Sequence, residues 1–358
     1  MYIINIPHEL LVLMLQFLNI SSVYAFCCVS KRIIILKYDC DCKHNIGSIQ
    51  LDALFNNHTH LFKWLIPENY LKTIPKTDQQ MLCGEAAEAG SLEILKYLHN
   101  NGCDFDPIET SMAALGGHLD ILKYLRENKC QWYLHTCCNA VKSGQLDIVK
   151  YLHENNCPWN PWCCEAAAEI GRIDILEYLR SNGCRWDYYT CAYAAKRNQI
   201  ETLQYLRKNG CPWGTQSCQN AARYGHVETL KYLHENGCPW DEICCALAVQ
   251  YGHLDVLKYL HENGCPWNEY TWSEAVEHGY SDIVKYLHEN KCPCDEDTCM
   301  NACRNGQFEI LRFLHENGCP WDDRSCYRAL KNGHQDILRY LHEHGCPCEI
   351  EDCEMCKK

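Results

Sequence analysis

The stretch YLHENGCPW occupies Tyr232–Trp240 and recurs unchanged at Tyr259–Trp267. Its cysteine returns at an interval of 27 residues, without an insertion, at Cys103, Cys130, Cys157, Cys184, Cys211, Cys238, Cys265, Cys292, Cys319 and Cys346. A fixed period of this length is the sequence signature of stacked units, each of which covers the apolar face of the next. The sequence therefore predicts a repeat array instead of the two or three separate domains that 358 residues would ordinarily suggest.

Each unit reads as two helices joined by tight turns. With the cysteine as position 0, position 14 is Gly in nearly every copy, and Asn198 replaces it once. Gly and Asn tolerate positive φ, so position 14 predicts a turn between the helices. In residues 252–263, GHLDVLKYLHEN, the apolar residues share one face of a helix. Residues 241–251, DEICCALAVQY, predict a shorter first helix that begins with Asp241 as N-cap.

The glycine of YLHENGCPW is predicted to end the second helix in a left-handed conformation, after which the proline prevents its continuation. Lys129, Asn156 and Lys291 stand at this glycine position in three copies, and we expect mild backbone strain there. The histidine of the stretch lies near the carboxyl end of the second helix, where a positive charge is favourable. The predicted fold class is all-α, a helix–turn–helix solenoid.

Residues 221–238, AARYGHVETLKYLHENGC, resemble the second half of the ankyrin repeat, A-A-x-x-G-H-x-x-I-V-K-x-L-L-x-x-G-A. The family period is 33 residues, and the six missing here fall where ankyrins carry a β-turn finger, so we expect a tight Pro–Trp turn instead. Residues 42–75 are identified as a degenerate capping repeat, residues 76–345 as repeats of 27 residues, and residues 346–358 as a truncated C-terminal cap. The resemblance implies about eleven units and a role in protein–protein interaction.

Residues 1–37 do not follow the period. Their pattern resembles the F-box, L-P-x-E-L-L-x-x-I-L-x-x-L, although Ile33 stands near the place of its terminal Trp. The resemblance implies that a Skp1-like adaptor of a ubiquitin ligase binds this head through Pro7, Glu9, Leu10, Leu11, Leu15, Leu18 and Val29. The alternative is a helical cap that covers the first repeat. An F-box ahead of a cysteine-rich YLHENG array resembles the ankyrin proteins of giant amoeba-infecting DNA viruses.

Composition narrows the possible functions. The net charge of −13 argues against nucleic-acid binding, which needs clustered Lys and Arg. No apolar run near the start approaches the length of a membrane span, and no basic segment precedes Leu10–Leu15 as in a signal peptide. We therefore expect a cytoplasmic monomer, in the host cell if viral, with its 30 cysteines reduced.

Metal, disulfide and catalytic chemistry were each weighed against a structural role. Cys346, Cys348, Cys353 and Cys356 have a spacing compatible with zinc, but core thiols explain them as well, and we expect no metal or cofactor. Equivalent cysteines of neighbouring units should lie ~10 Å apart, the usual helix-packing distance, which is too far for a disulfide. Catalytic residues are normally singular, whereas every histidine candidate here recurs, so we expect no enzyme.

Binding residues are expected at the positions that vary between copies, namely 4, 5, 8, 9, 12 and 13 of each unit, on the loop and first helix. Aromatic and Arg side chains are enriched in interface hot spots. The target-binding candidates are Trp162, Tyr188, Tyr189, Tyr193, Arg197, Arg223, Tyr224, Tyr251, Tyr270 and Arg304. The leading hypothesis is a protein that recruits a target to a Skp1/cullin-type ligase, and the alternatives are a binding scaffold without ligase coupling and a structural zinc protein.

Overall fold

The computed structural model describes residues 59–348. The seven F-box-like candidates Pro7, Glu9, Leu10, Leu11, Leu15, Leu18 and Val29, together with Cys353 and Cys356, lie outside this range. All regular elements within residues 59–348 are helices. None of these helices is long and apolar enough to cross a membrane.

The described residues form ten helix pairs preceded by two short helices, α5 (Thr59–Leu65) and α6 (Glu68–Leu71). The first helices of the pairs are α7 (Lys76–Glu88), α9 (Pro107–Gly116), α11 (Thr136–Lys142), α13 (Pro161–Glu169), α15 (Tyr188–Lys196), α17 (Thr215–Arg223), α19 (Glu242–Gln250), α21 (Glu269–His278), α23 (Glu296–Arg304) and α25 (Asp323–Lys331). The second helices are α8 (Leu92–Asn100), α10 (Leu119–Glu127), α12 (Leu146–Glu154), α14 (Ile173–Ser181), α16 (Ile200–Lys208), α18 (Val227–Glu235), α20 (Leu254–Glu262), α22 (Ser281–Glu289), α24 (Phe308–Glu316) and α26 (Gln335–Glu343).

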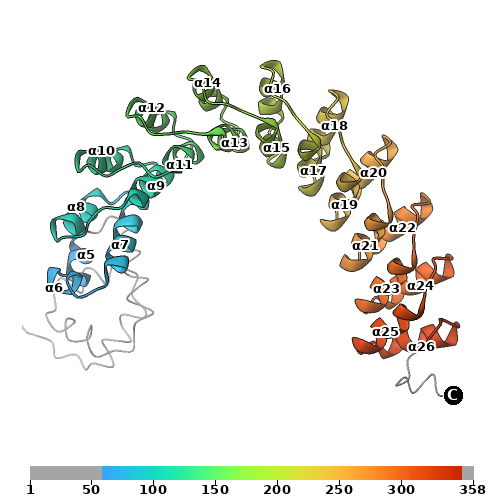
Figure 1. Cartoon of the computed structure of the whole chain (residues 1–358). Helices are drawn as coiled ribbons and strands as arrows, with labels where there is room; N and C mark the ends of the chain where they lie inside the picture. The colour runs from blue at the N-terminus through green and yellow to red at the C-terminus, as the bar shows by residue number, and fades with distance from the viewer. Residues whose placement is uncertain (1–58, 349–358) are drawn as a thin grey trace, which may run out of the picture. The chain divides into compact units, whose positions relative to one another are not determined.

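The chain divides into two compact units, residues 1–163 and 164–358, and α13 spans the boundary. Within the C-terminal unit the first helices α15 to α25 form one layer and the second helices α16 to α26 form another (Figure 1). The N-terminal unit repeats this arrangement with α7, α9 and α11 in one layer and α8, α10 and α12 in the other (Figure 1). The predicted helical solenoid is therefore confirmed.

The predicted turns are present. Gly225 and Gly252, at position 14, have φ of 74° and 75°, and Asn198 adopts the same conformation with φ of 58°. Lys129 and Lys291 also have positive φ, 63° and 56°, where most copies carry Gly. The sequence therefore identified the left-handed positions correctly, including those that must accommodate a side chain.

The core lies between the layers and between successive pairs. Leu257 and Leu260 of α20 are fully buried, as are Cys245 and Ala248 of α19. These small residues in the first layer let consecutive first helices approach closely. The second helix ends when the amide of Cys265 donates to the carbonyl of Leu260 at 2.9 Å.

The repeated cysteine does more than fill space. The Cys265 thiol donates to the carbonyl of Asp241 at 3.3 Å, and the Cys238 thiol to that of Gly214 at 3.4 Å. Each acceptor is the N-cap residue of the preceding first helix. The thiol thus joins the end of one unit to the start of the helix before it, a bond that the Ala of an ordinary ankyrin repeat cannot make.

The histidine of the opening stretch is explained by stacking. His234 lies against Trp240 with ring centroids 3.8 Å apart, and His261 lies against Trp267 at 3.9 Å. Where Arg replaces His, as at Arg207, the guanidinium lies 3.9 Å from the centroid of the following Trp213. The explanation from the helix dipole was therefore incomplete, because what His and Arg share is a flat group that packs on Trp.

Two further contacts refine the sequence-based interpretation. The histidine at position 15 links neighbouring units, since His253 Nε2 lies 3.1 Å from the carbonyl oxygen of Arg223. Asp241 is the N-cap of α19, as expected, but its side chain makes no capping bond. Its carboxylate instead accepts from Gln219 Nε2 at 2.9 Å, across to the preceding first helix.

Candidate protein-binding surface

Exposed tyrosines lie at both ends of the first helices in the C-terminal unit. Tyr188 and Tyr189 begin α15, and Tyr270 lies in the first turn of α21. Tyr224 and Tyr251 are the C-cap residues of α17 and α19. All five are exposed, from 40% at Tyr188 to 66% at Tyr270. We call these five residues the tyrosine set.

The tyrosine set is exposed because its positions face neither the other helix layer nor the neighbouring helix pair. Positions 7 and 10 of each unit, for example Cys245 and Ala248, face the core and are fully buried. The backbone that carries the tyrosines is fixed by caps and turns. Asn268 caps α21 by accepting from the amide of Tyr270 at 3.2 Å, and Tyr251 directly precedes the left-handed Gly252.

Arg223 is half-buried beside the tyrosine set. Its guanidinium lies 5.8 Å from the centroid of the Tyr251 ring, within the range of a cation–π contact. Its Nε is buried and has no hydrogen-bond partner among the described residues. A buried donor without a partner carries a desolvation cost of ~1–3 kcal/mol, which a ligand acceptor would remove.

Arg197 and Tyr193 are already engaged within the chain. Glu169 accepts from Lys196 Nζ at 2.8 Å and from Arg197 Nε at 3.2 Å. Burial raises the pKa of Glu169, but its bonds to the two cations outweigh this effect and hold that pKa below its usual range. Lys196 Nζ also lies 5.3 Å from the ring centroid of Tyr193, which is half-buried.

The remaining sequence candidates are Trp162 and Arg304. Trp162 lies in the N-terminal unit, is 50% exposed and stacks on His135 with ring centroids 5.5 Å apart. Arg304 is exposed at the end of α23, and its carbonyl oxygen lies 3.2 Å from His334 Nε2. The candidates thus divide into exposed side chains and the partly engaged Tyr193, Arg197 and Arg223.

The sequence candidates in the C-terminal unit leave out two exposed apolar residues at the same varying positions. Ile243 and Tyr327 are each 47% exposed, at positions 5 and 8 of their units. The positional rule already covered them, because both positions vary between copies. Lys331 Nζ lies 5.7 Å from the Tyr327 ring centroid, so this residue resembles Tyr251 in having a cation beside it.

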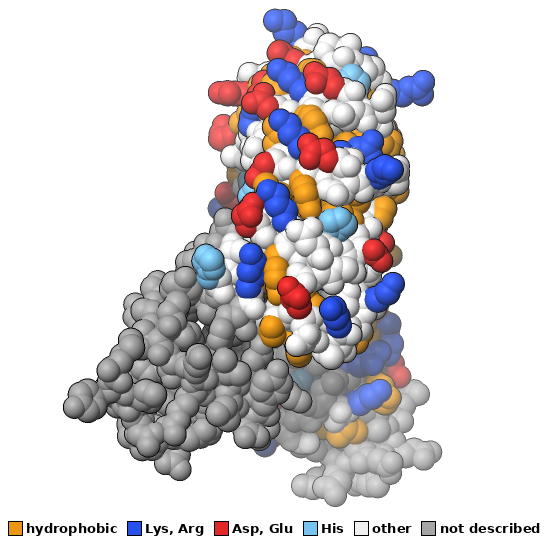
Figure 2. Space-filling model, turned by 90° about the vertical axis from the view of Figure 1, so that its left-hand side faces the viewer, with side chains coloured by type: hydrophobic (Ala, Val, Ile, Leu, Met, Phe, Trp, Pro, Cys, Tyr) orange, Lys and Arg blue, Asp and Glu red, His pale blue; other side chains and the backbone are white. Residues whose placement is uncertain are grey.

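The second helices present a different surface. Figure 2 views the side on which α8, α10 and α12 lie in Figure 1, and acidic and basic side chains are interspersed there. Pairs one turn apart, such as Lys96 with Glu93 and Lys231 with Glu228, are in contact at 2.8 Å. Such exposed pairs contribute little energy, typically ~0.2–1 kcal/mol, and are typical of a solvated face.

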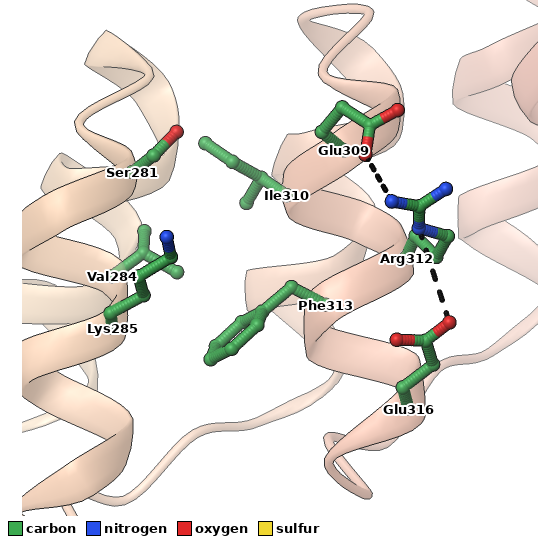
Figure 3. Close-up of a pocket in the computed structure, with 8 residues that line it drawn as sticks. All are labelled: Ser281, Val284, Lys285, Glu309, Ile310, Arg312, Phe313 and Glu316. Atoms are coloured by element: carbon green, nitrogen blue, oxygen red, sulfur yellow. Dashed lines mark ion pairs between the residues drawn. The ribbon is translucent and has the colours of Figure 1, made fainter.

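One shallow cleft of about 240 Å³ lies between α22 and α24 (Figure 3). Val284, Ile310 and Phe313 provide its apolar wall, and Arg312 closes one side through ion pairs with Glu309 and Glu316. Small-molecule sites are usually larger, ~300–1,000 Å³, and enclose the ligand. Neighbouring second helices contact one another less than neighbouring first helices do, which leaves room for this cleft.

Most of the thiols with a perturbed pKa are expected to be unreactive, because their pKa is raised. Burial raises the pKa of Cys130, Cys157 and Cys303 to about 12, so these thiols stay protonated at neutral pH. Of the four cysteines with a zinc-compatible spacing, two lie within the described residues: Cys346 donates its thiol to the Asp322 carbonyl at 3.3 Å, while Cys348 lies near Cys326 and His342.

Comparison with known proteins supports the repeat assignment. A family model described as ankyrin repeats, three copies, matches residues 191–271 and again residues 272–352. No curated protein matches the chain. The matched residues include the tyrosines at 224, 251 and 270, the helices from α16 to α26 and the carboxyl-terminal part of α15. Residues 191–352 are therefore similar to ankyrin repeats.

Proposed function

We propose that this protein is a non-catalytic scaffold whose ankyrin repeats bind a partner protein through the first helices of the C-terminal unit. The observation that carries the proposal is the tyrosine set, 40–66% exposed on a rigid layer of packed helices. Tyrosine supplies a large contact area at low entropic cost and is enriched in hot spots. Ankyrin repeats are modules of protein–protein interaction, and this likewise supports the binding of a partner protein.

The charges around the tyrosine set indicate the chemistry of the partner. Arg223 beside Tyr251, and Arg328 and Lys331 beside Tyr327, combine a cation with an exposed ring. An acidic segment carrying apolar side chains would satisfy both groups, and it would give the buried Arg223 Nε an acceptor. We propose an acidic, partly apolar protein segment as the target and place the interaction in the cytoplasm, with the scaffold as a monomer.

Photo-crosslinking tests the location of the surface. A photoreactive phenylalanine analogue at position 251 should capture a discrete protein in cells, whereas the same analogue at Lys258, exposed on the second helix α20, should not. Equal capture from both positions would place binding elsewhere. A reciprocal experiment with the purified captured protein separates direct binding from proximity.

We further propose that residues 1–37 couple the scaffold to a ubiquitin ligase. The support is the F-box-like pattern of Pro7, Glu9 and Leu10 in the sequence. A Skp1 homologue should be pulled down by the intact protein and lost on Leu10→Asp or Leu15→Asp. If the intact protein does not bind Skp1, the ligase coupling is wrong, but target binding by the repeats stands.

A further inference from the structure

Three metal-binding side chains converge at the carboxyl end of the described array. Cys326 lies on α25 and is fully buried, His342 lies in the last turn of α26, and Cys348 follows in the next loop. One ligand atom from each lies within 4.8 Å of the other two. His342 and Cys348 are half-buried, which leaves an approach from solvent.

The array itself shows how unusual this site is. In most units, Trp follows the repeated cysteine by two residues and packs on the preceding histidine or arginine, as Trp321 does on His315 at 3.9 Å. Cys348 stands at this Trp position in the last unit. Replacement of an indole by a thiol places a metal ligand beside His342 and frees the volume that the ring would occupy.

The other unit with this replacement lacks the third member. Cys294 also stands at the Trp position and follows His288, but the residue equivalent to Cys326 is Trp272, which is almost fully buried. Cys299 has the position of Cys326, but Trp321 follows it. Within residues 59–348, the Cys–His–Cys combination is therefore assembled at one place.

We propose that Cys326, His342 and Cys348 bind one zinc ion. Two thiolates and an imidazole are a ligand set that zinc favours, with Zn–S near ~2.3 Å and Zn–N near ~2.0–2.1 Å. A tetrahedron with these bonds needs ligand atoms about 3.8 Å apart. The ligand atoms now lie within 4.8 Å of one another, so they would have to approach by at most about 1 Å.

A water molecule would complete the tetrahedron as the fourth ligand. Cys353 and Cys356 follow Cys348 by five and eight residues. Both lie outside the described residues, and the variants below distinguish them from the proposed site. The metal would fasten the loop that carries Cys348 to α25 and α26.

Cobalt titration of the reduced full-length chain tests the site. One equivalent of Co²⁺ should give the visible bands of tetrahedral coordination together with thiolate-to-cobalt charge transfer, and Zn²⁺ should displace it. His342→Gln and Cys348→Ser should each weaken Co²⁺ binding at least about tenfold, the loss seen even for outer-shell partners. Circular dichroism of each metal-free variant checks that its helices are intact.

The chain provides a matched control. Cys294→Ser alters the same unit position beside His288 and should leave cobalt binding unchanged. The site is wrong if Co²⁺ gives no tetrahedral spectrum, or if Cys348→Ser binds it as tightly as the parent protein. It is also wrong if the Cys353→Ser, Cys356→Ser double variant loses binding while Cys326→Ser and His342→Gln retain it, because the metal would then belong to the terminal cysteines alone.

Discussion

At the residue scale, the helix-capping role of Glu109 conflicts with the burial of its side chain. Its Oε2 accepts from the amide of Asp106 at 2.7 Å and completes the capping box of α9. Its side chain is nevertheless fully buried, and Oε1 has no partner among the described residues. Burial raises the pKa of Glu109 to about 7, against hydrogen bonds that lower it.

This raised pKa predicts a loss of stability with rising pH. Between the unfolded pKa, near ~4.3, and the folded pKa of about 7, the folded state binds more protons, so the free energy of unfolding falls as pH rises. Glu109→Gln keeps the capping acceptor and should raise the free energy of unfolding at pH 8 by about 1–3 kcal/mol. It should have little effect at pH 4.

Urea unfolding of the full chain at both pH values measures the difference. Glu127→Gln, at an exposed residue of α10, is the control and should change stability equally little at both. A stabilisation by Glu109→Gln that is the same at pH 4 and pH 8 would contradict the ionisation argument and indicate a packing effect instead.

The stacked pair of each loop is a second prediction at this scale. His234 and Trp240 lie 3.8 Å apart by ring centroid, and the edge of Tyr259 approaches the indole at 6.4 Å. A double-mutant cycle of His234→Ala and Trp240→Ala should give a coupling energy of about 0.5–1.5 kcal/mol, the range of stacked aromatic pairs. Additive effects of the two changes would show that the stacking is incidental.

At the element scale, the turns fix where each helix ends. Gly264 ends α20 with φ of 79°, and a Cβ there would have no atom within 4 Å, so the requirement is purely conformational. Lys291 carries the same turn at the end of α22 with φ of 56°. For an L-residue this conformation costs ~1–2 kcal/mol.

Lys291→Gly should therefore raise the free energy of unfolding by about 0.5–1 kcal/mol, less than the full strain because Gly loses more entropy on folding. Gly264→Ala should lower it by a similar amount. Thermal melts of both variants measure the pair. Equal and small effects of opposite sign support the argument, whereas destabilisation by Lys291→Gly would mean that the lysine makes a contact worth more than its strain.

The helices and turns were largely predictable from the sequence because the pattern of each one recurs in every copy of the repeat. Gly252 and its equivalents mark the turn, and the spacing of Leu257 and Leu260 marks the buried face of α20. Long-range partners were not predictable in this way. The bond from the Cys265 thiol to the Asp241 carbonyl, and the meeting of Cys326 with Cys348, depend on how units stack in space.

At the scale of the whole molecule, the two helix layers have different roles. The first helices pack closely through Ala, Cys and Thr and display the tyrosine set at their ends. The second helices carry interspersed charges and leave a shallow cleft between α22 and α24. Variation between copies selected the target candidates, but it could not tell which of them are exposed, as the half-buried Tyr193 and Arg223 show.

The most direct test measures the affinity of the photo-crosslinked partner for a variant that lacks three members of the tyrosine set. These are the three that lie in the residues matched by the ankyrin-repeat model. Tyr224→Ala, Tyr251→Ala and Tyr270→Ala together should raise Kd at least about tenfold, since interface aromatics carry much of the binding energy. The control is Glu235→Ala, Lys258→Ala and Lys285→Ala, at exposed residues of the second helices α18, α20 and α22. We predict that it leaves Kd unchanged, and a loss of affinity confined to the control would contradict the account.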